Sequence, residues 1–336
     1  MTAPREILPD RIWFLTRRTT QRQFLLRPDE ETTRIFDYCL AQAAERFNID
    51  LIAWLVMSNH YHAVVRDRDG NLPQFMEHLH KMVAKAVNAH RERRENLWSS
   101  EEASAIYLPT PEDVFEKVVY TLTNPIADDL VDRVADWPGS NSYAQLQDAT
   151  NVERARPEKY FAASGRMPVK ASLRATFPAL ARGRESIGEW TARVRAAISN
   201  REATLRAGRR HEKRVVLGAE AVRDVSPFAA PKTAEPPRRG KLPCVACSNP
   251  ERRRVELECL VRFLAAYREA RQQFVAGRRN TTFPAGTYRF RALGARCAPY
   301  PNARGAIRRS EPARRLASPR AGRSDTRSVT CRAASA

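Results

Sequence analysis

Two apolar runs joined by a short turn constrain the fold of this chain most strongly. Residues 51–56 and 63–65 are wholly apolar and predict two buried strands, and Ser58-Asn59 between them has the composition of a tight hairpin turn. Strands joined by so short a turn pair in antiparallel fashion. The sequence therefore predicts an antiparallel sheet that contains this hairpin.

Two histidines stand at the start of the second predicted strand, in the segment His60-Tyr61-His62. Residues two apart on a strand point to the same face, so the imidazoles of His60 and His62 are expected side by side, with Tyr61 on the opposite face. Paired imidazoles on a rigid backbone suit a divalent metal ion. The same spacing also fits two histidines that only pack or hydrogen-bond.

A helix that carries a tyrosine and an amide is predicted further along the chain. Residues 110–113 combine a capping threonine, a proline suited to the first helical position and two acids at the positive end of the helix dipole. Tyr120 and Asn124 lie four residues apart and share one face, away from the apolar stripe. Pro125 predicts that the helix ends at about Asn124. An ordinary half-exposed tyrosine and a helix-ending asparagine fit this pattern equally.

Together these stretches resemble a known family, the REP-associated tyrosine transposases. These are single-tyrosine HUH transposases of the insertion-sequence-200-like superfamily, and His60-Tyr61-His62 is similar to their HUH signature, histidine–bulky apolar–histidine. The run LIAWLVMSNHYHAVV (51–65) resembles the family segment aycLMPNHvHll. The run VVYTLTNPIADDLV (118–131) resembles rYIhxNPvrAGLV, and DWPGSNSY (136–143) resembles WpwSSY.

The resemblance covers about residues 8–145, with its motifs in the family's order, which is far more specific than any one motif. The departures are Ser58 for the usual proline, Tyr61 for valine, and Asp128-Asp129 where Ala-Gly is common. None of them removes a group that the family's chemistry needs.

The resemblance implies a reaction and a set of site residues. His60, His62 and Asn124 would hold Mg²⁺ or Mn²⁺, and the phenolic oxygen of Tyr120 would attack a DNA phosphate. The products would be a 5′-phosphotyrosine bond and a free 3′-hydroxyl, so that the strand can be rejoined to another end. The substrate would be single-stranded DNA beside a hairpin.

Two other functions stay open at this stage. One is a DNA-binding regulator whose chemistry has lapsed. The other is a metal-dependent phosphoesterase that uses the two histidines with water as the nucleophile. The presence of all the proposed catalytic residues argues against the lapsed regulator, and Tyr120 discriminates between the alternatives and the transposase.

The predicted succession of elements is β-α-β-β-α-β-α. Its strands lie at about 11–20, 50–57, 60–66 and 106–108, and its first two helices at about 29–47 and 72–91. This order predicts an α+β fold, a ferredoxin-like sandwich with an antiparallel sheet and helices packed on it. The HUH core implied by the resemblance has the same architecture.

The charge of the chain is unevenly distributed. The formal net charge is +20, yet residues 1–150 hold 17 Lys and Arg against 23 Asp and Glu, so the remaining residues carry +26. A strongly basic half predicts a polyanionic partner. In the first half we expect contacts to DNA from Arg17, Arg18, Lys81 and Lys85, although a solvated helix face explains the two lysines as well. His78 and His80, on the same predicted helix, are expected at the surface.

Composition divides the chain into a transposase domain (1–148), a basic and mainly helical extension (149–225), a Pro-rich linker (226–243), a helical accessory segment (244–298) and a disordered basic tail (299–336). The extension could form a small helical domain or dock on the core. A homodimer is compatible with this organisation.

No signal peptide and no apolar run of about 20 residues is visible in the sequence, which predicts a cytoplasmic protein without a membrane partner. The six cysteines are scattered and do not resemble a secreted disulfide framework. Cys244 and Cys247 form an isolated CxxC pair, and whether they bind a metal stays open.

Overall fold

The computed structural model describes residues 4–148, 151–178, 181, 183–234 and 244–301. In chain order its elements are β1 (Arg11–Arg18), η1 (Thr20–Arg22), α1 (Glu30–Phe47), β2 (Ile49–Val56), β3 (His60–Asp67), α2 (Leu72–His90), β4 (Ser104–Leu108), α3 (Pro111–Ala127), η2 (Val134–Asp136), α4 (Tyr143–Asp148), β5 (Val152–Ala155), β6 (Lys170–Leu173), α5 (Ile187–His211), α6 (Ala219–Asp224), α7 (Pro250–Val275) and α8 (Arg289–Ala292).

The main sheet has four strands in the order β2-β3-β1-β4, and every neighbouring pair is antiparallel. The predicted α+β class is therefore confirmed. The succession β1-α1-β2-β3-α2-β4, with β1 and β3 at the centre of the sheet, has the connectivity of the ferredoxin-like motif.

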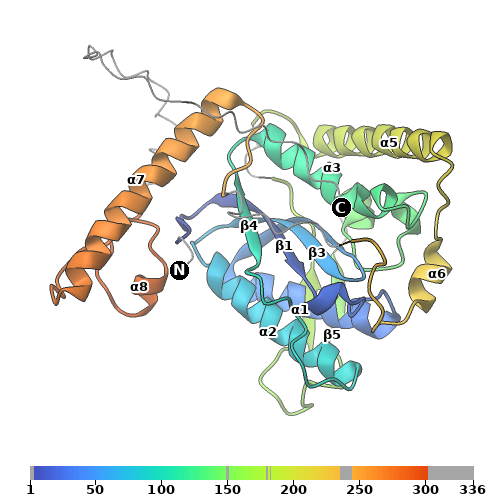
Figure 1. Cartoon of the computed structure of the whole chain (residues 1–336), viewed down its shortest axis with the longest axis horizontal. Coiled ribbons are helices and arrows are strands. Elements are labelled where there is room, and N and C mark those ends of the chain that lie inside the picture. The colour runs from blue at the N-terminus through green and yellow to red at the C-terminus, as the bar shows by residue number, and fades with distance from the viewer. Residues whose placement is uncertain (1–3, 149–150, 179–180, 182, 235–243, 302–336) are drawn as a thin grey trace. The chain divides into compact units, whose positions relative to one another are not determined.

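Helices cover both faces of this sheet. Helices α1 and α2 lie against one face, and α3 crosses the other (Figure 1). Along β1 the side chains alternate accordingly: Trp13 and Leu15 pack under α1 and α2, whereas Ile12 and Phe14 pack under α3. Both faces of the sheet are thus buried, which explains why each central strand contains an uninterrupted apolar run, at 12–15 in β1 and at 63–65 in β3.

Each edge of the sheet is covered by an irregular segment. Residues 139–142 run beside β2, where the Val56 amide donates to the Ser140 carbonyl at 2.9 Å and the Ser142 amide donates to the Trp54 carbonyl at 3.0 Å. At the opposite edge the Tyr107 amide donates to the Cys244 carbonyl at 2.9 Å. Backbone groups that an open edge would leave unpaired are therefore satisfied. The sequence motif at 136–143 therefore covers the β2 edge of the sheet.

Helix α3 is longer than predicted. It continues to Ala127 and contains Pro125, although Pro125 was expected to end it near Asn124. The last turn is closed by the Asp128 amide, which donates to the Asn124 carbonyl at 3.1 Å. Pro125 and Ile126 are both buried, so packing of this turn against the core outweighs the hydrogen bond that proline cannot donate.

The segment after α4 contains a hairpin that the sequence did not predict. Strands β5 and β6 pair in antiparallel fashion, and Ala171 and Leu173 join the core beneath α1. The hairpin is short and interrupted by glycine and proline in its connection, so it has no clear strand signal of its own.

Helix α5 docks on α3. In Figure 1 the two helices lie side by side, and Trp190, Val194 and Ile198 of α5 are buried in the core that α3 also enters. The Trp190 and Phe115 rings are 5.7 Å apart. The sequence left open whether the extension forms a small helical domain or docks on the core, and helix α5 docks on the core. The contacts between residues group the chain up to Tyr300 into one compact unit.

The remaining boundaries expected at 148, 225, 243 and 298 stay predictions. Residues 302–336 of the tail predicted to be disordered, and residues 235–243 of the Pro-rich linker, lie outside the described residues. In the part of the chain that the structure describes, no helix combines the length and the apolar character needed to cross a membrane.

The close packing of residues 139–142 against β2 leads to a stability prediction at Gly139. A Cβ at this position would lie 2.8 Å from Trp137 Nε1, 3.0 Å from Pro28 Cβ and 3.2 Å from the Val56 carbonyl oxygen. Because the last contact is to backbone, Gly139→Ala should lower the free energy of unfolding by about 1–3 kcal/mol, as overpacking does elsewhere. Urea unfolding followed by circular dichroism measures the difference.

Gly208→Ala is the matched control. Gly208 lies inside α5, and a Cβ there meets nothing within 4 Å. Alanine should stabilise this helix by about 0.5–1 kcal/mol. Equal unfolding free energies for the two variants would contradict the packing described for Gly139.

Candidate active site

The two histidines project from β3 on the α3 side of the sheet. Their Nε2 atoms are 3.2 Å apart, and their rings meet edge to face with centroids 4.8 Å apart. Pairing between β1 and β3 sets Thr16 opposite His62 and Arg18 opposite His60. The His62 ring also stacks on Phe14 at 5.2 Å, so its orientation is fixed by packing as well as by the strand.

Each Nδ1 atom has its own hydrogen-bond partner, which leaves the Nε2 atoms facing each other. His60 Nδ1 lies 2.7 Å from Asn59 Oδ1, and the Asn59 amide nitrogen donates to the Arg22 carbonyl at 3.3 Å. This fixes the amide orientation, so His60 Nδ1 donates its proton and His60 Nε2 keeps a lone pair. His62 Nδ1 lies 2.8 Å from Thr16 Oγ1, a hydroxyl that can donate or accept and thus tolerates either tautomer.

Tyr120 and Asn124 of α3 face the histidines across the core. The Tyr120 ring is 5.5 Å from the His62 ring and 5.9 Å from Phe14. The Asn124 amide lies between, where it interacts with both His60 and Tyr120. Asn124 is buried whereas Tyr120 remains partly exposed, so a substrate can reach the phenol. The structure thus brings together Tyr120, His60, His62 and Asn124.

Burial determines the protonation of these groups. Burial and, to a smaller extent, Arg18 lower the pKa of His60 to about 4, while Asn124 opposes the shift. The pKa of His62 is lowered well below its usual value by burial, by His60 and by Lys117. Both imidazoles are therefore neutral near pH 7, with lone pairs available.

The phenol of Tyr120 is shifted in the opposite sense. Burial is the largest cause of its raised pKa, and the nearby Asp128 carboxylate adds to it. Arg201, Asn124 and Arg18 act to lower the same pKa without cancelling the increase. Ionisation of this phenol thus requires additional positive charge.

Three cations from three elements approach the site. Arg18 comes from β1, Lys117 from α3 and Arg201 from α5. Lys117 Nζ lies 5.0 Å from the centroid of the Tyr120 ring, and Arg18 and Arg201 are close enough to act on its pKa. The site therefore combines neutral metal-binding groups with a surrounding positive potential, as a site for a phosphate needs.

The other predicted DNA contacts lie elsewhere. Arg17 points to the opposite face of the sheet from Arg18 and donates to His80 Nδ1 at 2.7 Å. Lys81 and Lys85 are exposed on α2, which also covers that opposite face. The structure therefore does not bring Arg17, Lys81 or Lys85 to the histidine pair.

His80 corrects a prediction, because it is buried rather than at the surface. Its Nδ1 accepts from Arg17, so in the neutral ring Nε2 donates to the Tyr61 hydroxyl at 2.7 Å. Trp98 packs against the same imidazole at 5.3 Å. Tyr61, one of the departures from the family pattern, is accommodated by this polar network on the face away from the site.

The residues present fit a divalent metal ion. Asn124 Oδ1 is buried and has no hydrogen-bond partner among the described residues, and the Asn124 amide interacts with His60. Two neutral imidazoles and an amide oxygen form a donor set for a divalent metal ion: the oxygen suits Mg²⁺ or Mn²⁺, whereas imidazole nitrogens suit transition-metal ions. Within the described ranges, no three His, Cys, Asp or Glu residues are grouped as metal ligands.

The CxxC pair lies beside the start of α3. Cys247 interacts with Asp113, and burial together with this carboxylate raises the pKa of its thiol to about 11. Among the described residues, Cys39, Cys247, Cys259 and Cys297 are free thiols.

No family model matches the chain, and neither does any curated protein. Among solved structures, the chain is similar to a REP-associated tyrosine transposase bound to a REP hairpin, with 18% identity and a TM-score of 0.38 over 44% of this chain and 86% of the other. It is similar to a candidate transposase from Deinococcus radiodurans R1, with 18% identity and a TM-score of 0.26 over 32% of this chain and 85% of the other.

The chain is also similar to the tRNA(His) guanylyltransferase of Saccharomyces cerevisiae, with 12% identity and a TM-score of 0.30 over 44% of this chain and 69% of the other. All three TM-scores are below 0.5. The site is accordingly defined by its own residues rather than by these similarities.

Sequence reasoning missed four residues of the site: Thr16, Asn59, Lys117 and Arg201. Asn59 adjoins His60, and Lys117 lies three residues before Tyr120 on one helix, so both could have been found from local spacing. Thr16 is identified only by the β1–β3 register, and Arg201 only by the docking of α5.

The contact between Thr16 and His62 leads to a prediction about metal binding. Thr16→Val removes the hydroxyl while preserving its shape, so the His62 ring loses the partner that orients it. Loss of such a partner typically weakens metal affinity by about 10–100-fold. Titration of the protein with Mn²⁺, followed by electron paramagnetic resonance of the free ion, measures the change.

Thr16→Ser keeps the hydroxyl and should bind Mn²⁺ nearly as the wild type does. If Thr16→Val and Thr16→Ser bind Mn²⁺ equally well, the hydroxyl does not position His62.

Proposed function

We propose that this protein is a transposase that cleaves and rejoins single-stranded DNA through a 5′-phosphotyrosine intermediate on Tyr120. The observation that carries the proposal is the convergence of a partly exposed tyrosine with two neutral, facing imidazoles and a buried amide oxygen without a partner. These groups come from β3 and α3, and they are the positions matched by the family motifs.

His60, His62 and Asn124 would hold Mg²⁺ or Mn²⁺. Bound there, the ion supplies positive charge that polarises the scissile phosphate and stabilises charge on its oxygens. Asn59 and Thr16 orient the imidazoles through their Nδ1 atoms, and neither residue touches the substrate in this proposal.

Tyr120 is the nucleophile. Its oxygen forms a bond to phosphorus as the bond from phosphorus to the 3′-oxygen breaks. The phenol gives up its proton, and the departing 3′-oxygen takes up a proton to become a hydroxyl. No water is consumed, so the attack of a new 3′-hydroxyl on the phosphotyrosine reverses the step and joins two strands.

The substrate must be single-stranded because the phenol lies between α3 and the sheet, where a paired and stacked backbone cannot bend to reach it. Duplex next to the cleaved strand, as in a hairpin, could remain outside. The proposed substrate is therefore single-stranded DNA flanked by a hairpin, and the protein would act where DNA is present in a reducing cytoplasm.

One observation favours a second candidate, a metal-dependent phosphoesterase that uses water. Burial and Asp128 raise the pKa of Tyr120, which makes the phenol a poorer nucleophile until a cation approaches. In a phosphoesterase the histidines would serve the same purpose and Tyr120 would only line the site.

Strand cleavage by Tyr120 predicts a covalent adduct of defined polarity. We would incubate the protein and Mn²⁺ with single-stranded oligonucleotides covering the hairpins that flank its gene, labelled at either end, and run denaturing gels. A 3′ label should migrate with the protein, and a 5′ label should appear on a shorter free strand. Tyr120→Phe should abolish both, because phenylalanine has no oxygen to attack phosphorus.

Tyr267→Phe, in α7, is the matched control and should form the adduct normally. Cleavage that persists in Tyr120→Phe with no label on the protein would identify the phosphoesterase. Binding without cleavage by the wild type would identify a regulator whose chemistry has lapsed.

A further inference from the structure

Lys117 occupies a position that the proposed chemistry has not used. It lies on α3 three residues before Tyr120, and its Nζ is 5.0 Å from the Tyr120 ring and 5.3 Å from the Phe14 ring. The side chain is half-buried, and among the described residues no carboxylate forms a salt bridge with it. Burial lowers the pKa of this ammonium group. A cation held against two aromatic faces without a paired anion is suited to receive one.

A second cation reaches the same place from the C-terminal extension. Arg201 belongs to α5, which packs on the core beside α3 through Val194 and Ile198, and it acts on the pKa values of both Lys117 and Tyr120. Arg201 is exposed, so its guanidinium is accessible to a ligand in solvent.

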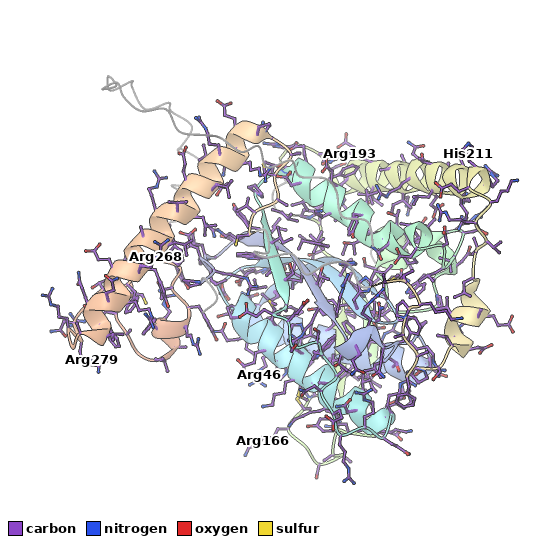
Figure 2. All side chains as sticks on the ribbon, viewed as in Figure 1. Arg46, Arg166, Arg193, His211, Arg268 and Arg279 are labelled. Carbon is purple, nitrogen blue, oxygen red and sulfur yellow. The ribbon has the colours of Figure 1, made fainter. Side chains whose placement is uncertain are left out.

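Several contacts hold α5 rigidly in position. The Val134 amide donates to Glu202 Oε1 at 2.8 Å, directly beside Arg201 in sequence. Arg209 is buried and pairs with Asp132 at 2.9 Å and with Asp129 at 3.6 Å. Near the other end of α5, Arg193, labelled in Figure 2, lies 4.1 Å over the Phe115 ring. Arg201 is therefore presented by a helix anchored on both sides of it.

Two neighbouring cations repel each other, and among the described residues neither forms a salt bridge, although Glu116 and Asp113 act on the pKa of Lys117. An anion placed between them would relieve this repulsion. Glu116 and Asp113 lie on the same helix as Lys117, whereas Asp128 acts on the pKa of Tyr120 and is influenced by Arg18.

We propose that Lys117 and Arg201 form a binding site for the phosphates of a nucleic-acid strand, with Lys117 contacting the phosphate that Tyr120 attacks and Arg201 an adjacent one. The inference rests on the proposed function for the choice of ligand. It makes Lys117 a further catalytic residue and gives the C-terminal extension a direct part in the site. A lysine acts there as a compact point charge, whereas the arginine fork can grip two phosphate oxygens.

The first test measures binding without cleavage. A fluorescein-labelled oligo(dT) of about 20 nucleotides, long enough to cover a single-strand site, is titrated in EDTA at several salt concentrations and followed by anisotropy. Lys117→Met and Arg201→Gln should each weaken binding by about tenfold, as loss of a charged hydrogen bond does. Each should also reduce the slope of log affinity against log salt by about 0.7, the value for one phosphate contact on a single strand.

The controls are Lys170→Met on β6 and Arg210→Gln on α5, which remove the same charges elsewhere and should bind like the wild type. Lys117→Met keeps the aliphatic contact with the rings, and thermal melting checks that it folds. Lys117→Arg retains the charge and should restore most of the binding. Wild-type affinity and salt slope in both Lys117→Met and Arg201→Gln would overturn the inference.

The second test measures adduct formation with Mn²⁺ and separates this inference from the proposed function. Lys117→Met should slow the adduct by about 100-fold at saturating DNA, because the lost charge acts on the transition state. If the wild type forms no adduct but the two variants still lose binding, the transposase proposal fails and the phosphate site stands. If the adduct forms and Lys117→Met binds and cleaves normally, the transposase stands and this inference fails.

Discussion

The antiparallel pairing of β1 with β3 is the constraint on which the site depends. Its register sets Thr16 opposite His62 and Arg18 opposite His60, on the face that α3 covers. A shift of one residue would turn both imidazoles to the other face, where α1 and α2 pack against Tyr61. The register is itself fixed by burial, because Phe14 and Val64 must face α3 while Trp13 and Val65 face the other helices.

The two faces of the sheet carry two polar networks with different properties. On the α1 and α2 side, Arg17, His80 and Tyr61 form a closed chain in which the hydrogen bonds satisfy the imidazole on both nitrogens. On the α3 side, the two Nε2 atoms face each other at 3.2 Å, and the buried Asn124 oxygen has no hydrogen-bond partner among the described residues. A satisfied buried network stabilises one core arrangement, whereas unsatisfied groups that converge on one point are typical of a binding site.

The C-terminal extension contributes to the same site that the N-terminal half builds. Asp129 has a left-handed backbone, with φ of 56°, and pairs with Arg209 and Arg214 of the extension. Asp129, one of the departures from the family motif, therefore forms salt bridges with arginines of the basic C-terminal extension. Asp128, beside it, faces Tyr120 and Arg18 instead.

The sequence by itself determined the elements with strong local signals: the hairpin, the alternation that separates His60 and His62 from Tyr61, and the capped helix of Tyr120 and Asn124. These depend on periods of two and 3.6 residues, which are local properties of a strand and a helix. It did not determine the end of α3, because burial of Ile126 outweighs the effect of Pro125, or the β5–β6 hairpin, whose strands are short. Only the tertiary structure decided that Arg17 and Arg18 serve opposite faces, that His80 is buried, and that Thr16 and Arg201 join the site. These outcomes depend on register and helix docking, which arise from contacts between residues far apart in the chain.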